Sequence, residues 1–181
     1  MQPFHKDSNT GKSHSLRSCV VILDFGSQFA HLLANRIRRL GVYSEIRDAT
    51  ASAASLKSGN YKGIILSGGP ASVNDPASPK LDPEIFKLGI PILGVCYGHQ
   101  IIMHALGGVV TKGTVGEHGP VQFTVDENAG VLSKLETGTT YPVYASHFDV
   151  VSAVPEGFKV IGHTSDDNFC ATYNEARKIY T

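Results

Sequence analysis

Short runs of consecutive apolar residues recur through the first half of the chain, and amphipathic segments separate them. Residues 19–23 form the clearest run, Cys-Val-Val-Ile-Leu, which is typical of a strand buried on both faces of a parallel sheet. Residues 29–40 instead place Phe, Leu, Ile and Leu at helical spacing, and Gly41 marks the end of this helix. The same reasoning predicts strands at residues 42–46, 63–66 and 90–95, and helices at residues 51–58, after Asp82-Pro83 and at residues 100–106.

The pattern becomes strand-rich beyond about residue 108. Short apolar segments separated by turn residues predict strands at residues 121–125, 142–146, 158–162, 169–173 and 178–180. The alternation of strands and helices before that point predicts a doubly wound α/β domain, with a mostly parallel sheet flanked by helices. Ligands bind beyond the carboxyl ends of such strands, so a site is expected near residues 24–28, 67–70 and 96–100.

Composition excludes several classes of protein. The 181 residues carry 16 basic and 16 acidic side chains, and this neutral balance argues against nucleic acid or a membrane surface as a partner. Residues 1–17 are polar and lack the apolar segment of a secretory signal, so we expect a disordered tail on a cytoplasmic protein whose single domain spans residues 18–181. The three cysteines are too widely spaced for a disulfide framework or a metal-ligand pattern, so we expect no metal site.

The segment from Gly94 to Gly98 carries the strongest chemical signal. Its sequence, Gly-Val-Cys-Tyr-Gly, follows an apolar strand and precedes a helix, which is the pattern of a nucleophile elbow. The helix N-terminus favours the thiolate form of Cys96, and the amide of Tyr97 is placed to donate to an oxyanion. A buried core cysteine is the alternative, and it is disfavoured because glycines flank Cys96 on both sides in the right context.

A second glycine-rich segment, Ser67-Gly68-Gly69-Pro70, follows the predicted strand at residues 63–66. Two successive glycines let the backbone approach a ligand closely. Alone this segment is an ordinary loop. Beside an elbow in the same sheet, it predicts a second oxyanion donor.

These segments carry a family resemblance. From about residue 18 onward the chain resembles the class I glutamine amidotransferase domain of the glutamine-hydrolysing GMP synthases, whose predicted fold is flavodoxin-like. The matching strings appear in order: Leu23-Asp24-Phe25-Gly26-Ser27-Gln28, Ser67-Gly68-Gly69-Pro70, Gly94-Val95-Cys96-Tyr97-Gly98-His99-Gln100 and Ser146-His147-Phe148-Asp149.

The resemblance implies a reaction and its residues. Cys96 attacks the side-chain amide of glutamine, ammonia leaves, and water frees glutamate from the thioester. The backbone amides of Gly69 and Tyr97 form the oxyanion hole. The glutamine pocket is assigned to Gln100 and to the loop of Ser146, His147 and Asp149, which holds the α-amino and α-carboxylate groups of the substrate.

The resemblance also implies a partner. Ammonia passes to an ATP-pyrophosphatase synthetase domain, in the same or another chain, that adenylates and aminates XMP to GMP with ATP and Mg²⁺. That domain is not among these residues, and no cofactor is expected for the amidotransferase domain itself.

Two departures from the family pattern stand out. Phe148 occupies a position that is usually glycine, which alters the close approach of backbone to substrate. The family also continues past a strand like that at residues 178–180 into a Q-F-H-P-E segment, which supplies the general-base histidine and its orienting glutamate. Thr181 precedes any such segment, so we expect a truncated, poorly active domain. The base is not assigned to His99, His104, His118 or His147.

Two other functions stay open. The chain is alternatively a catalytically incompetent module that binds glutamine or docks a synthetase. It is also compatible with another cysteine-elbow enzyme, such as a γ-glutamyl hydrolase, although the strings around Asp24 and Cys96 argue against that class.

Overall fold

The computed structural model describes residues 19–181, with the side chains of residues 114–117 excepted. The tail predicted at residues 1–17 lies outside the described residues. The helices are α1 (Ala30–Arg39), α2 (Ala53–Ser58) and α3 (Tyr97–Ala105), with 3-10 turns η2 (Pro83–Lys87) and η3 (Gly130–Leu132). The strands are β1 (Cys19–Asp24), β2 (Tyr43–Asp48), β3 (Gly63–Leu66), β4 (Ile92–Gly94), β5 (Val109–Val125), β6 (Thr140–Ala153), β7 (Lys159–His163), β8 (Ala171–Asn174) and β9 (Ile179–Tyr180).

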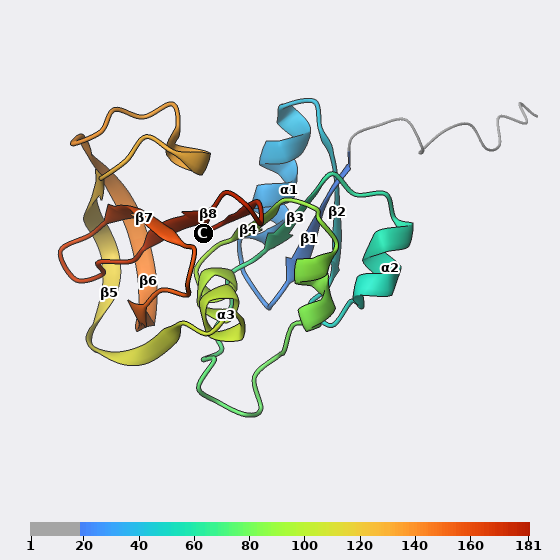
Figure 1. The fold of residues 1–181 in the computed structure, drawn as a ribbon, viewed down its shortest axis with the longest axis horizontal. Coiled ribbons are helices and arrows are strands. Elements are labelled where there is room, and N and C mark those ends of the chain that lie inside the picture. Colours follow the sequence, from blue (N-terminus) through green and yellow to red (C-terminus); the bar gives the residue numbers. More distant parts are fainter. Residues whose placement is uncertain (1–18) are drawn as a thin grey trace, which may run out of the picture.

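All of these strands belong to one mixed sheet with the order β2-β1-β3-β4-β9-β8-β7-β5-β6 (Figure 1). Parallel pairing joins the first five strands of this order, β2, β1, β3, β4 and β9. Antiparallel pairing joins β9 to β8 and continues through β7 and β5 to β6. The predicted α/β alternation, completed by β9, therefore forms the parallel half, and the other strands of the C-terminal part form the antiparallel half.

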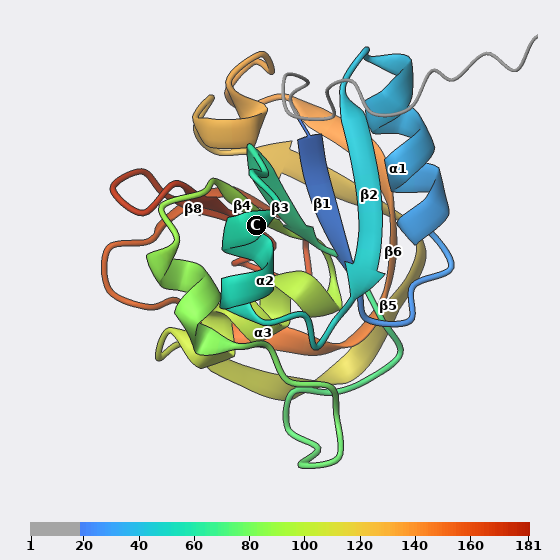
Figure 2. The ribbon, with the colours of Figure 1, turned by 90° about the vertical axis from the view of Figure 1, so that its right-hand side faces the viewer.

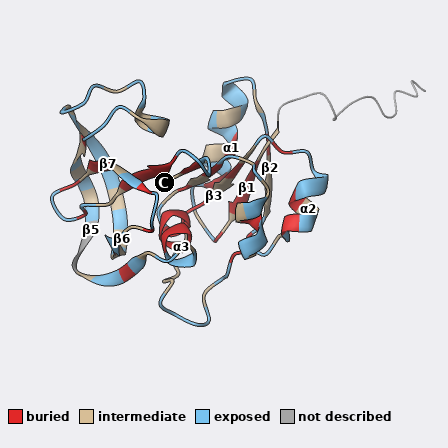
Figure 3. Ribbon diagram, in the orientation of Figure 1, coloured by how far each residue is buried: buried red, intermediate tan, exposed pale blue. Residues whose placement is uncertain are grey.

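Helices cover both faces of the parallel half (Figure 2). On one face, Ala30 and Ala34 of α1 pack against Ile22 of β1. On the other face, a larger core joins α2, η2 and α3 to the opposite side of β1, β3 and β4. Helix α3 is the most deeply buried of the three helices, as its colouring in Figure 3 shows, because it lies between the sheet and the base of the β5–β6 ribbon.

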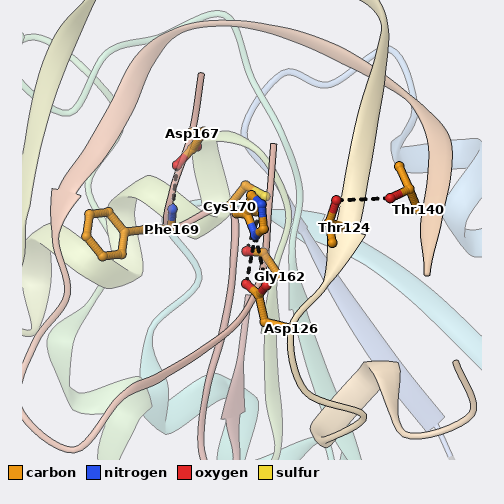
Figure 4. A network of polar contacts seen from close by, with 8 residues as sticks. Thr124, Asp126, Thr140, Gly162, Asp167, Phe169 and Cys170 are labelled. Atoms are coloured by element: carbon orange, nitrogen blue, oxygen red, sulfur yellow. Dashed lines mark hydrogen bonds and ion pairs between the residues drawn. The ribbon is translucent and has the colours of Figure 1, made fainter. Parts of the chain in front are cut away.

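Polar contacts hold the antiparallel half together around β7 (Figure 4). His163 Nδ1 lies 2.9 Å from both carboxylate oxygens of Asp126, just beyond β5. The Cys170 thiol donates to the Gly162 carbonyl at 3.5 Å, and the Phe169 amide donates to the Asp167 carboxylate at 2.9 Å. These contacts fix the turn between β7 and β8.

The predicted elements of the parallel half are confirmed to within a few residues. The strand at residues 63–66 has the predicted bounds, and Ser52 caps α2 through a hydrogen bond from the Ser55 amide. The segment after Asp82-Pro83 is a 3-10 turn of five residues, although Asp82 caps it as predicted. Strands β5 and β6 are much longer than the predicted strands at residues 121–125 and 142–146. No described helix is long and apolar enough to cross a lipid bilayer.

Candidate functional site

Cys96 lies on a strained turn between β4 and α3. Its backbone has φ 51° and ψ −112°, a conformation that L-residues other than glycine rarely adopt. Helix α3 begins at the next residue, Tyr97. This geometry matches the nucleophile elbow that the sequence predicts, since it raises the cysteine side chain beyond the end of a central strand.

Two glycines make the elbow possible by bringing α3 against the sheet. A Cβ placed on Gly98 would lie 2.2 Å from the carbonyl oxygen of Leu66 in β3. A Cβ on Gly94 would lie 2.5 Å from the carbonyl oxygen of Gly98. Neither position can hold a side chain without moving the strand or the helix, so the spacing of glycines around Cys96 has a packing cause.

The Ser67–Pro70 segment lies directly against the elbow. A Cβ on Gly68 would be 3.3 Å from the Cβ of Cys96, a tight contact that would push against the elbow. The hydroxyl of Ser67 is fully buried, accepts from the Phe25 amide at 3.0 Å and donates to the Gly68 carbonyl at 2.8 Å. Ser67 thereby links the ends of β1 and β3 and holds the glycine loop beside Cys96.

The structure brings every predicted site residue to one cleft of about 550 Å³. The members of that set are Gly69, Cys96, Tyr97, Gln100, Ser146, His147 and Asp149, and they come from the β3–η2 loop, the β4–α3 turn, α3 and β6. Residues far apart in the sequence thus line the same cleft.

Ser146, His147 and Asp149 lie within strand β6, so the prediction of a loop there was wrong. The reason is the long pairing of β6 with β5, where His147 faces Glu117 and Asp149 faces Lys112. The Gln100 side chain donates from Nε2 to the Asp149 carbonyl at 2.9 Å, which ties α3 to β6 across the cleft.

Besides Pro70 and Ala71, four cleft residues with polar or aromatic side chains were not predicted as site residues: Ser72, Lys112, His118 and Phe148. Phe148 is 57% exposed and its ring packs edge-on against the ring of His118, with centroids 4.5 Å apart. The departure from the family's glycine thus adds an aromatic rim to the cleft. Of these four residues, only Phe148 could be noticed in the sequence, because it stands where the family usually has glycine. The other three residues belong to no recognisable motif.

The thiol of Cys96 lacks a partner that would activate it. Burial of the sulfur raises its pKa above the ordinary value, although the residue keeps exposed surface. Among residues 19–181 its sulfur forms no hydrogen bond. Desolvation therefore opposes the thiolate that the helix N-terminus favours, and a base must come from elsewhere.

His99 is buried beside the elbow and is unsuited to serve as that base. Its side chain faces a second cavity of about 270 Å³ that Cys96 also lines, and neither ring nitrogen has a hydrogen-bond partner in the described part of the chain. Burial, and secondarily the nearby His147, lowers the pKa of His99 to about 4. His104 is exposed on the same helix. The described residues contain no group of three or more histidine, cysteine, aspartate or glutamate side chains able to hold a metal ion.

Comparisons with known proteins relate the chain to one family. A family model, glutamine amidotransferase class-I, matches residues 21–181. The glutamine-hydrolyzing GMP synthase of Trichormus variabilis is 46% identical over 164 residues, which are 91% of this chain and 30% of that protein. The enzyme of the same name from Crocosphaera subtropica is 44% identical over 179 residues, 99% of this chain and 33% of that protein.

Solved structures share the fold. A protein from Thermoplasma acidophilum, provisionally named as a GMP synthase subunit, superposes with a TM-score of 0.76 at 22% identity, covering 92% of this chain and 83% of its own. PurLQS from Thermotoga maritima superposes with a TM-score of 0.66 at 17% identity, covering 91% of this chain and 85% of its own.

The chain belongs to the class I glutamine amidotransferase family. Within that family, its sequence is similar to the amidotransferase part of the glutamine-hydrolysing GMP synthases. It spans about a third of the length of these curated relatives.

Proposed function

We propose that this domain hydrolyses glutamine to glutamate and ammonia through a thioester on Cys96. The observation that carries the proposal is the strained elbow at Cys96, packed against the Gly68-Gly69 loop at the wall of a cleft. A cysteine raised in this way is positioned to attack a carbonyl carbon held in the cleft.

The chemistry divides into two steps. In the first, the Cys96 thiol gives its proton to a base, and the sulfur forms a bond to the amide carbon of glutamine. The Gly69 and Tyr97 amides are proposed to stabilise the resulting oxyanion, after which the carbon–nitrogen bond breaks and ammonia leaves with a proton. In the second, water adds to the thioester, the carbon–sulfur bond breaks, and glutamate and the Cys96 thiol are released.

The substrate is proposed to lie with its amide at the elbow and its amino acid end toward β6. Gln100, Ser146, His147 and Asp149 line that end of the cleft. We propose that the general-base histidine and its orienting glutamate come from outside these 181 residues, because His99 is buried with a pKa of about 4.

The proposed destination of the ammonia is a synthetase domain, in the same or another chain, that uses ATP and Mg²⁺ to convert XMP to GMP. The support is the identity of 44–46% to proteins named as GMP synthases. We propose the cytoplasm as the compartment, since no disulfide joins Cys19, Cys96 and Cys170.

The experiment compares glutamate release by this chain with release by a version extended by the C-terminal segment of a similar GMP synthase. A positioned acid/base contributes roughly 10²–10⁴-fold, so the extended protein is expected to be faster by about that factor. Cys96→Ser in the extended protein is the control and is expected to abolish turnover. Equal turnover by the two lengths would contradict an external base, and turnover by Cys96→Ser would contradict the nucleophile.

A docking or binding module is the second candidate function. The raised pKa of Cys96 and the absence of a hydrogen bond to its sulfur within residues 19–181 favour it. It predicts that glutamine binds to the extended protein but that the same assay finds no release of glutamate.

A further inference from the structure

Two backbone amides at the cleft have no hydrogen-bond acceptor. The amide of Gly69 and that of Tyr97, the first residue of α3, donate to no other described residue. Both residues line the cleft beside the Cys96 elbow. Rotation of a single peptide plane reverses the direction of its N–H, so the direction of the Gly69 donor depends on what holds its peptide.

The hydroxyl of Ser67 holds the peptide between Gly68 and Gly69. It donates to the Gly68 carbonyl at 2.8 Å, whereas its 3.4 Å distance to the Asp24 carboxylate is too long to compete for the same proton. In a trans peptide the carbonyl and the following N–H point in opposite directions. Because Ser67 is fully buried and Gly69 lines the cleft, this hydrogen bond directs the Gly69 N–H away from the core and into the cleft.

The backbone of Ser67 holds the second donor. Its carbonyl accepts at 3.0 Å from the amide of Gly98, the residue directly after Tyr97. Ser67 is itself fixed to β1, because its amide donates to the Leu23 carbonyl at 3.0 Å and its hydroxyl accepts from the Phe25 amide at 3.0 Å. One buried residue thus joins the two segments that carry the free amides.

Phe25 packs against the same two segments. Its ring lies against the Tyr97 ring, with centroids 5.4 Å apart and an interplanar angle of 57°. Its carbonyl oxygen would lie 2.3 Å from a Cβ on Gly69. Residues 24–28, expected near a site from the sequence, do not line the cleft, so Phe25 supports the wall of the cleft from behind.

We infer that Ser67 is a positioning residue of the oxyanion hole. Its hydroxyl orients the Gly68-Gly69 peptide so that the Gly69 N–H and the Tyr97 N–H converge on one oxyanion, and Phe25 sets the separation of the two donors. The inference rests on the proposed thioester chemistry and adds the side chains that align its donors. Neither side chain touches the substrate, so both act through the backbone.

The test compares two reactions of Cys96 in the 181-residue chain at alkaline pH. Acylation by 4-nitrophenyl butyrate passes through an oxyanion: the thiolate bonds to the carbonyl carbon, 4-nitrophenolate leaves, and a butyryl thioester remains. Alkylation by iodoacetamide displaces iodide from a saturated carbon and forms no oxyanion. Peptide mass spectrometry measures both rates at Cys96, with and without excess glutamine.

Ser67→Ala is expected to slow acylation about 10²-fold and to leave alkylation unchanged, because the loss of one oxyanion donor costs roughly 10²–10³-fold. Phe25→Leu removes the ring contact with Tyr97 and is expected to slow acylation about tenfold, again without an effect on alkylation. Ser44→Ala is the matched control. Ser44 is also a fully buried serine whose hydroxyl donates to a backbone carbonyl, that of Ala34 at 3.0 Å, but it does not line the cleft, so neither rate should change.

The outcomes separate this inference from the proposed function. If glutamine slows both reactions of the wild type, but acylation is unchanged in Ser67→Ala and Phe25→Leu or falls only as much as alkylation, the positioning role is wrong while the glutamine site stands. If glutamine slows neither reaction of the wild type, the proposed glutamine site is wrong and this inference falls with it.

Discussion

Lowering the pH from 7 to 4 is expected to destabilise the fold by about 3 kcal/mol through His99 alone. The pKa of this buried imidazole is about 4 in the folded protein and about 6.5 in the unfolded chain. As the pH falls, His99 therefore takes up a proton at a higher pH in the unfolded chain than in the folded protein. The contribution of His99 to stability is complete above pH 6.5 and is lost progressively as the pH falls to about 4.

Urea unfolding at a series of pH values measures this effect. His99→Met fills similar space without a titrating group, so its free energy of unfolding should vary less between pH 6.5 and 4 than that of the wild type. Carboxylates such as Asp48 and Asp82, whose pKa values are lowered by hydrogen bonds, contribute equally to both proteins. His104→Asn, on the exposed side of the same helix, should keep the wild-type slope. Identical pH dependence in wild type and His99→Met would show that His99 is not buried as described.

Gly98→Ala is expected to lower the free energy of unfolding by about 3 kcal/mol and to disrupt the elbow. The added Cβ would lie 2.2 Å from the carbonyl oxygen of Leu66 and 2.7 Å from its carbonyl carbon. That oxygen already accepts a hydrogen bond from the Val95 amide at 3.0 Å, so the strand cannot turn its carbonyl away without loss. Helix α3 must therefore move away from β3 and shift Cys96.

Gly63→Ala is the matched control for this substitution. Gly63 lies in β3, the strand that contains Leu66. A Cβ on Gly63 would lie 3.6 Å from the Val20 side chain, which is an ordinary contact. Its stability should stay within about 1 kcal/mol of the wild type, with unchanged alkylation of Cys96. Equal stability of Gly98→Ala and Gly63→Ala in urea unfolding would contradict the tight packing of α3 against β3.

The parallel half of the fold could be predicted from the sequence because its signals are local. The run at residues 19–23 and the flanking glycines of Cys96 each specify their own structure, whichever residues lie far away in the chain. The 3-10 turn after Pro83 differs from the predicted helix because only five residues separate the Asp82 cap from Leu88. Predictions succeeded where neighbouring residues determine the conformation.

In the antiparallel half the predicted strands at residues 158–162 and 169–173 are confirmed as β7 and β8, but the extent of β5 and β6 depends on contacts between distant residues and was not predicted. Residues 109–120 contain glycine, threonine and charged side chains without clear alternation, yet they form β5 because β6 pairs with them. The contact between Ser72 and Asp149 joins residues 77 positions apart, and no local pattern indicates it. The burial of His99 likewise follows from packing of α3 under the β5–β6 ribbon, which its neighbours in sequence do not reveal.

The most direct test of the central claim, that Cys96 is the nucleophile of a glutamine site, is covalent labelling with a diazoketone analogue of glutamine. The labelled chain is digested, and each cysteine is mapped by mass spectrometry in the presence and absence of excess glutamine. We expect a single label on Cys96, formed faster than on Cys19 or Cys170, and slowed by glutamine. Equal labelling of the three cysteines, or labelling of Cys96 that glutamine does not slow, would contradict the assignment.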